Sequence, residues 1–225
     1  MPDTALVVMA RYPHIGTTKT RLARTLGDAE TVRLYRAFLT DLAHKFAGKT
    51  YDLHWAYTPA NIDYLSFIAT LATTLTEHMR AFPQQGIDFG ARLHNAFQYT
   101  YDQGYQRTIV IGSDSPQISM KIIMQAQKGL DKSDVVLGPA DDGGYYLIAM
   151  RRPYDVFSGI PMSTSVVAQK TIELAQSQGL KVHTLEQLFD VDELPDLLRL
   201  ARLLEADSSL APETANQLST MKEFV

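Results

Sequence analysis

The fold is decided near the N-terminus by the stretch ALVVMARYPHIGTTKTRLA, residues 5–23. Its first six residues are uniformly apolar, which is typical of a strand covered on both faces, as in a parallel sheet. Pro13 and Gly16 then interrupt regular structure, and Lys19 and Arg21 follow where a helix is expected to begin. Such a strand-to-helix turn predicts an α/β protein with its ligand site at the carboxyl end of the strand.

This turn is also the best candidate for a phosphate site. A strand-to-helix turn offers free backbone N–H groups and a positive helix end, and lysine and arginine add charge and bidentate contacts. Residues 1–27 carry Arg11, Lys19, Arg21 and Arg24 against Asp3 alone, although the whole chain has a net charge of −4. We therefore expect an anionic ligand here; the alternative is a solvated loop with ordinary cations.

Two familiar nucleotide motifs are excluded. A P-loop ending at Thr20 would require glycine at the positions of Pro13 and Thr18. No G-x-G-x-x-G follows the first apolar run, so a dinucleotide-binding fold of that type is not expected.

The rest of the chain alternates short apolar runs with amphipathic segments. Such alternation predicts an α/β protein with a mostly parallel, doubly wound sheet. The predicted strands are residues 5–10, 52–58, 78–82, 107–112, 134–138, 145–150 and 181–185. The predicted helices are residues 29–46, with Asp28 as its N-cap, 62–71, 89–101, 120–130, 165–178 and 194–205.

Length and composition limit the class of protein. We expect one nucleotide-binding transferase domain over residues 1–205, and a C-terminal extension over 206–225 that packs on it or serves an oligomer such as a homodimer. The absence of cysteine excludes disulfides, thiolate metal sites and cysteine nucleophiles. The acidic balance argues against nucleic acid as a partner, and no run approaches the ~20 apolar residues of a membrane span. A cytoplasmic location is the corresponding expectation.

Asp114 is the candidate metal ligand. It lies in the sequence GSDSP, residues 112–116, at the end of an apolar strand, where its carboxylate would point into the ligand crevice. Magnesium binds to few protein carboxylates together with substrate phosphates and water. The alternative is a turn-forming aspartate without a ligand.

Two further clusters are candidates. The sequence GPADDGGYY, residues 138–146, joins two strands, and its paired glycines suit either a close approach to a ligand or a simple hairpin turn. Asp190 and Asp192 precede the last long helix; they could hold a metal, or one of them could cap that helix. No histidine pair with metal spacing and no G-x-S-x-G elbow is present.

Taken together, five ordered motifs resemble a known family. They are R-x-P-x-x-G-x-x-K-T-R-L-A from residue 11, G-I-D-F-G-A-R-L from 86, G-S-D-S-P from 112, G-P-A-D-D-G-G-Y-Y-L from 138 and D-V-D from 190. The chain resembles the glycosyltransferase-A-type (nucleotide-diphospho-sugar transferase) superfamily. More narrowly, it is similar to the radical SAM/selenodomain-associated transferase 1 group, itself similar to the coenzyme F420 guanylyltransferase and to molybdenum-cofactor nucleotidyltransferases.

The resemblance implies a three-layer α/β sandwich and assigns roles to residues. Asp114 and Asp192 would bind Mg²⁺ or Mn²⁺, and Lys19, Arg21 and Asp114 would be catalytic. The residues near the nucleotide would be Arg11, Gly16, Lys19, Arg21, Gly90 and Arg92, and those on the acceptor side Asp142, Gly143, Gly144 and Tyr145.

This chain departs from the family pattern at three positions. Arg11 replaces the usual lysine, which keeps the charge. Met162 replaces the tryptophan of an I-P-W-S-T segment, so the acceptor pocket is expected to differ. Ala149 replaces a glycine, which we interpret as a packing change.

The expected activity is metal-assisted nucleotidyl transfer from a nucleoside triphosphate to a small phosphorylated acceptor. The alternative is glycosyl transfer from a nucleotide-diphosphate sugar on the same scaffold. A long cationic loop suits a triphosphate, whereas sugar transferases depend on an internal D-x-D, and residues 190–192 lie too late in the chain for that role. A third alternative is a nucleotide-binding module without activity.

Overall fold

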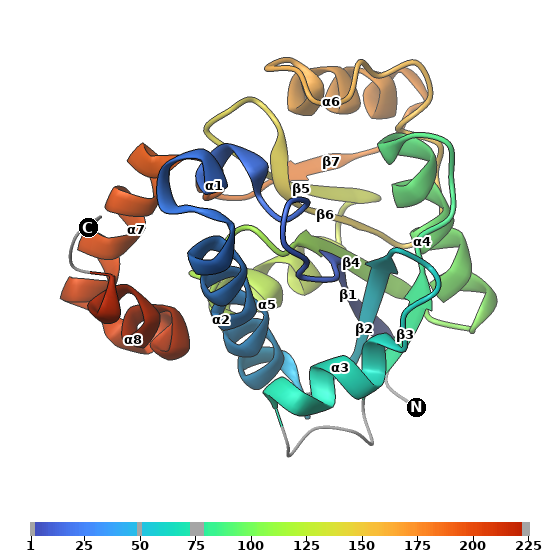
Figure 1. The fold of residues 1–225 in the computed structure, drawn as a ribbon. Coiled ribbons are helices and arrows are strands. Elements are labelled where there is room, and N and C mark those ends of the chain that lie inside the picture. The colour runs from blue at the N-terminus through green and yellow to red at the C-terminus, as the bar shows by residue number, and fades with distance from the viewer. Residues whose placement is uncertain (1–2, 49–50, 73–78, 222–225) are drawn as a thin grey trace.

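The computed structural model describes residues 3–48, 51–72 and 79–221. In that part of the chain, a seven-stranded mixed sheet is covered by helices on both faces (Figure 1). The strand order is β3-β2-β1-β4-β6-β5-β7. The strands are β1 Thr4–Arg11, β2 Asp52–Thr58, β3 Met79–Pro83, β4 Arg107–Gly112, β5 Val135–Pro139, β6 Tyr145–Met150 and β7 Val182–Thr184.

The sheet is parallel except at β6. This strand pairs antiparallel with both β4 and β5, whereas the other neighbouring pairs run parallel. The loop of residues 140–144 between β5 and β6 is too short for a crossover, and strands joined by a short loop pair antiparallel. The expectation of a mostly parallel α/β sandwich is confirmed, with this one reversal.

The uniformly apolar first strand is buried on both sides. Leu6 and Val8 pack into a core with α2 (Asp28–Phe46) and α5 (Met120–Gly129), whereas Val7 and Met9 pack into a second core with α4 (Phe89–Asp102). Period-two alternation therefore places both sets of residues away from water, which explains why the run contains no polar residue.

Six of the eight α-helices in the described residues match the predicted ranges except at their ends; the first begins where a helix was expected after the first loop, and the last lies in the C-terminal extension. They are α1 Thr20–Leu26, α2 Asp28–Phe46, α3 Tyr64–Leu71, α4 Phe89–Asp102, α5 Met120–Gly129, α6 Val167–Ser177, α7 Leu194–Ala206 and α8 Pro212–Thr220.

Two predictions at helix and strand ends need comment. The prediction of Asp28 as an N-cap is wrong: Gly27, with φ +79°, takes that position between α1 and α2, and Asp28 is the first helical residue. A glycine adopts this backbone conformation at little cost, so it ends one helix and starts the next. His78, the first residue of a predicted strand, lies outside the described residues.

The C-terminal segment lies on α2. Asp41 accepts hydrogen bonds from the backbone N of Glu213, at 2.9 Å, and of Thr214, at 2.8 Å, and so caps α8 from another helix. Lys45 donates to the carbonyl oxygens of Leu210 and Pro116, and thus ties the same segment to the loop after β4. No helix among the described residues is long and apolar enough to cross a membrane.

Candidate active site

A cleft of about 650 Å³ opens at the carboxyl ends of β1 and β4. This is the edge of an α/β sheet where ligands bind. Seven of the residues singled out in the sequence line it: Arg11, Gly16, Lys19, Arg21, Arg92, Asp114 and Asp192. The structure therefore brings the first loop, the start of α4, the end of β4 and the loop before α7 together at one site.

The first loop is held in shape by Thr18. Its hydroxyl oxygen accepts a hydrogen bond from the His14 backbone N at 2.8 Å and lies 2.9 Å from the His14 carbonyl oxygen, to which it donates. Gly16 has φ +81° with open space around it, so the backbone is accessible at that point. Lys19, the N-cap of α1, also has a positive φ, +40°, which is unusual for a non-glycine residue.

Lys19 lies at the centre of the site. Its side chain is 6% exposed, and its Nζ lies 2.7 Å from Asp114 Oδ1 and 3.4 Å from Asp192 Oδ1. It also donates to the carbonyl oxygen of Val191 at 2.6 Å. Burial alone would lower the pKa of Lys19, but the two carboxylates outweigh burial and the pKa is raised. The ammonium is therefore charged, and it joins the two carboxylates.

Asp114 and Asp192 meet because two loops are hydrogen-bonded together. The backbone N of Val191 donates to the Asp114 carbonyl oxygen at 2.9 Å, and Gln117 Nε2 donates to the Phe189 carbonyl oxygen at 2.7 Å. Since both carboxylates contact the same Nζ, their Oδ1 atoms are at most about 6 Å apart.

The helix-capping alternative for Asp192 is wrong. Glu193 is the N-cap of α7 and forms a capping box with Asp196. The carboxylate of Asp192 faces the cleft instead, between Lys19 and Arg21.

Asp190, the other aspartate of that motif, is not among the residues that line the cleft. Its Oδ1 accepts a hydrogen bond from the Ser115 hydroxyl. Burial, together with the nearby charges of Asp114 and Asp142, raises the pKa of Asp190 to about 7, although the Ser115 hydrogen bond opposes the rise. Asp190 therefore fastens the two loops together.

The donor set of the cleft fits magnesium or manganese. No group of three or more histidine, aspartate or glutamate side chains suited to a metal occurs in the described ranges. The carboxylates of Asp114 and Asp192 both lie close to one position. The Lys19 ammonium shows that this position attracts a cation. Mg²⁺ commonly binds one or two carboxylates and completes its shell with phosphate and water, so two are enough.

The remaining cations of the cleft are more accessible. Arg21 is 62% exposed, with its Nη1 3.4 Å from Asp192 Oδ2. Arg11 is exposed at the end of β1, and Arg92 on α4 donates from Nε to the Gly86 carbonyl oxygen at 3.3 Å. These guanidinium groups can bind phosphate without breaking a buried ion pair.

Tyr35 and Gln84 also line the cleft, although neither was singled out in the sequence. Tyr35 Oη accepts a hydrogen bond from the Arg11 backbone N at 3.1 Å and lies 2.8 Å from Ser113 Oγ. Burial raises the pKa of Tyr35 to about 12, so the phenol stays protonated. Gln84 donates to the Ala10 and Ala56 carbonyl oxygens, between β1 and β2. Tyr35 follows the apolar periodicity of α2, so its sequence position indicates only a core residue.

The residues assigned to the acceptor side do not line this cleft. Asp142 Oδ1 accepts a hydrogen bond from the Gly144 backbone N, and Gly143 packs so closely on Ser165 that a Cβ would lie 2.0 Å from the Ser165 carbonyl oxygen. Tyr145 packs against the second core.

Gly90 lines a separate pocket of about 560 Å³ together with Met162. A Cβ on Gly90 would lie 3.0 Å from Met162 Cε. The nucleotide role of Gly90 and the acceptor roles of Asp142, Gly143, Gly144 and Tyr145 stay predictions.

Residues 43–164, more than half of the chain, match the family described as "Uncharacterized protein conserved in bacteria (DUF2064)". The chain belongs to this family. Its sequence is also 25% identical, over 151 residues, to the 2-phospho-L-lactate guanylyltransferase of Methanothermobacter thermautotrophicus. That match covers 67% of this chain and 63% of the archaeal protein, which is less than two thirds of the latter's length.

Solved structures extend the comparison to the whole length of this chain. A protein of Desulfovibrio desulfuricans G20, provisionally assigned as a nucleotide-diphospho-sugar transferase, has a TM-score of 0.90 and 34% identity, with 100% of this chain and 97% of that chain covered. A cytidylyltransferase of Leptospira borgpetersenii has a TM-score of 0.55 and 15% identity, with 99% and 95% covered, so that likeness concerns the fold alone. The resemblance inferred from the five motifs is confirmed for family and fold, and these relatives are named as transferases.

Proposed function

We propose that this DUF2064 protein is a nucleotidyltransferase that transfers the nucleotidyl group of a nucleoside triphosphate to a small phosphorylated acceptor. The observation that carries the proposal is the meeting of Lys19, Asp114 and Asp192 in one cleft whose rim holds three further arginines. Phosphoryl chemistry needs mainly positioning and charge neutralisation, and this cleft offers cations for phosphate and carboxylates for a metal.

Each group has a distinct part in the proposed reaction. Arg11, Arg21 and Arg92 bind the triphosphate and offset the charge that develops on the leaving pyrophosphate. Lys19 holds Asp114 and Asp192 at one position and adds its own positive charge beside the phosphates.

A divalent metal ion, Mg²⁺ or Mn²⁺, would be held by Asp114 and Asp192. When bound, it would neutralise phosphate charge and orient the leaving group. The chain itself supplies the two carboxylates and the hydrogen bonds between the two loops that keep them in place.

The named relatives suggest which substrates to test first. The archaeal relative is a guanylyltransferase for 2-phospho-L-lactate, so GTP with a phosphorylated hydroxy acid is one starting pair. The Desulfovibrio structure favours the second candidate function, transfer of a sugar from a nucleotide-diphosphate sugar. The two activities differ in their products, since the first releases pyrophosphate and the second a nucleoside diphosphate.

The test is a product assay with Mg²⁺. Each of the four ribonucleoside triphosphates, and separately nucleotide-diphosphate sugars, is incubated with the protein and a panel of phosphorylated hydroxy acids and sugar phosphates. We expect acceptor-dependent release of pyrophosphate that Asp114→Asn abolishes, because an amide is a poorer metal ligand than a carboxylate. Glu173→Gln is the matched control, since Glu173 is an exposed carboxylate on α6 that pairs only with Lys170 and Gln169 in the described structure.

Release of a nucleoside diphosphate instead of pyrophosphate would replace the proposal by its glycosyltransferase alternative. Turnover that is equal in the Asp114→Asn and wild-type proteins would contradict the assignment of the site.

A further inference from the structure

A second cleft, of about 700 Å³, lies at the opposite end of the sheet. β6 ends beside the start of β4, where Met150 pairs with Thr108. The cleft opens there, whereas the candidate active site lies beyond Gly112 at the other end of β4. A strand of this length separates the two sites by roughly 20 Å.

The second cleft carries a net positive charge, because two arginines and one aspartate line it. Arg151 and Arg152 follow β6 directly, line the cleft and are exposed. Among the described residues, neither takes part in an ion pair. Asp134 is the only acidic residue of the lining, and its Oδ2 already accepts the Lys181 backbone N–H at 2.9 Å. Two guanidinium groups on neighbouring residues are therefore exposed and form no ion pair within the described part of the chain.

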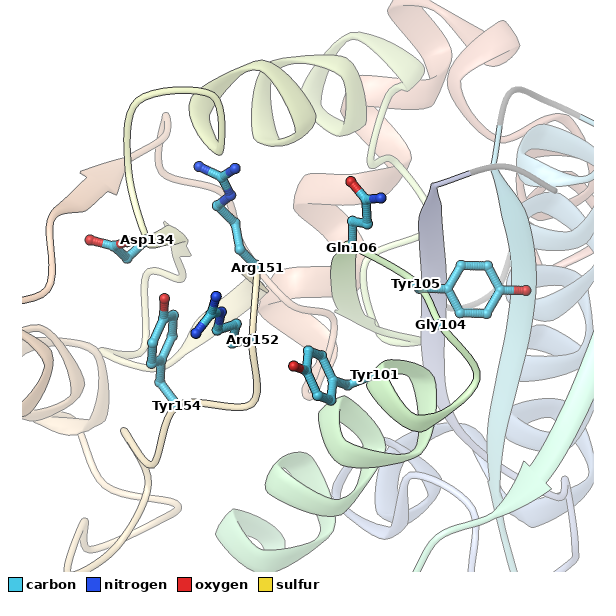
Figure 2. A pocket seen from close by; sticks show the side chains of 8 residues that line it. All are labelled: Tyr101, Gly104, Tyr105, Gln106, Asp134, Arg151, Arg152 and Tyr154. Atoms are coloured by element: carbon cyan, nitrogen blue, oxygen red, sulfur yellow. The ribbon is translucent and has the colours of Figure 1, made fainter.

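Two aromatic rings flank the same hollow. Figure 2 shows the side chains of Tyr101, from the end of α4, and Tyr154 on opposite sides of Arg152. Tyr105 points away from them, and its hydroxyl donates to Asp52 Oδ2 at 2.6 Å, so it belongs to the core. The cleft thus combines two arginines with one exposed ring, Tyr101, and one half-buried ring, Tyr154. Exposed Gln106 adds an amide to the lining.

We propose that this cleft is a second binding site, separate from the active site, for a phosphate ester that carries a flat ring, as a nucleotide does. Arg151 and Arg152 bind the phosphate, since guanidinium groups match its geometry and hold it bidentately. The ring stacks on Tyr101 or Tyr154, because aromatic side chains stack on bases largely irrespective of base identity. A volume of several hundred Å³ is in the range of small-ligand sites.

The proposal concerns binding, not a second catalytic centre. The lining holds one carboxylate and no lysine, so the pair of carboxylates that characterises the active-site cleft is lacking here. The site is additional to the proposed function. A ligand bound there would lie roughly 20 Å from the proposed active site.

The test is an NMR titration of the ¹⁵N-labelled protein with GMP, and separately with ribose 5-phosphate, in the presence of a metal chelator. The chelator removes divalent metal ions and so weakens nucleotide binding at the proposed active site. We expect GMP to shift the amide signals of Gly104, Gln106 and Arg152, equally in wild type and in Asp114→Asn. Arg151→Gln and Arg152→Gln should each weaken binding about tenfold or more, because each removes charge-assisted hydrogen bonds. Arg202→Gln, an exposed arginine on α7, is the control and should bind as wild type does.

Comparison of GMP with ribose 5-phosphate separates the contribution of the ring to affinity from that of the phosphate. In wild type, ribose 5-phosphate should bind more weakly than GMP, and Tyr101→Ala should reduce GMP affinity toward that of ribose 5-phosphate. Three results would overturn the proposal: no shift of these amides with GMP, equal GMP affinity in both arginine variants and wild type, or ribose 5-phosphate binding as tightly as GMP.

Discussion

At the scale of single residues, Lys19 combines a structural and a chemical role. Removing the buried ammonium would leave Asp114 without its ion pair and the Val191 carbonyl oxygen without its donor, although both carboxylates are 43% exposed and Asp192 would still face Arg21. We therefore predict that Lys19→Met lowers the free energy of unfolding by about 1–3 kcal/mol, the cost of hydrogen bonds lost from a charged group. Arg21→Ala should change it by less than about 0.5 kcal/mol, because Arg21 is mostly exposed and its ion pair is long.

Urea unfolding of the three proteins measures this difference, and triphosphate binding by the folded variants gives the second readout. Both substitutions should weaken binding, since each removes a cation from the cleft. A Lys19→Met protein as stable as wild type would show that the two carboxylates do not depend on the ammonium.

The sequence predicted the residues of this cleft better than their pairings. Lys19, Arg21, Asp114 and Asp192 were all identified from motifs. The ion pair between Lys19 and Asp114 was not, because it depends on the hydrogen bonds between two distant loops, which no local pattern encodes. Tyr35 was missed for a related reason: a tyrosine on the apolar stripe of a helix has the same sequence signature in the core and beside a ligand.

At the scale of the elements, the β5–β6 connection depends on one glycine. Gly143 has φ +87°, and a Cβ there would meet the Ser165 backbone, so Gly143→Ala must displace the turn that precedes α6. We predict a loss of stability of about 2–4 kcal/mol from strain and steric overlap together. Gly179→Ala is the matched control: its φ of +77° is similar but nothing lies within 4 Å, so it should cost only about 1–2 kcal/mol.

Thermal unfolding of the two variants checks this prediction. Equal losses would mean that the backbone conformation alone, and not the contact with Ser165, requires glycine at position 143. In the sequence, the paired glycines suited a ligand contact and a hairpin equally well. Whether close packing requires glycine at position 143 depends on where Ser165 lies, and the sequence does not reveal that position.

The strand and helix positions were predictable where the apolar period was clear. β4 has the predicted bounds because an apolar run, residues 109–111, lies between Arg107 and the GSDSP turn. β2 also has the predicted bounds, although His54 interrupts its apolar residues. The reversal of β6 was left open by the sequence, because residues 138–146 suited either a ligand contact or a hairpin, and the strands of a hairpin pair antiparallel.

At the scale of the whole molecule, stability should depend on the charge of one core histidine. His54 on β2 is fully buried. Its Nε2 lies 3.1 Å from Tyr105 Oη, and its Nδ1 has no hydrogen-bond partner among the described residues. Burial lowers the pKa of His54 from 6.5 to about 4, with Arg80 adding to the shift and Asp52 partly opposing it.

Because the folded-state pKa is the lower one, the unfolded chain binds more protons between pH 6.5 and pH 4. The contribution of His54 to the free energy of unfolding is therefore fully present above pH 6.5. It is lost as the pH falls toward 4, which lowers the free energy of unfolding by about 3 kcal/mol in total. We predict that His54→Gln removes this part of the pH dependence. The measurement is the difference in unfolding free energy between the two proteins across that interval, and a difference that does not vary with pH would contradict the prediction.

The central claim for the molecule is that Asp114 and Asp192, joined by Lys19, form the metal and triphosphate site of a nucleotidyltransferase. A crystal grown with Mn²⁺ and either GTP or CTP tests it most directly, because manganese is located by its anomalous scattering. We expect one Mn²⁺ at ~2.1 Å from a carboxylate oxygen of Asp114 and of Asp192, with the triphosphate along residues 16–21. Manganese bound elsewhere, or a triphosphate outside this cleft, would contradict it.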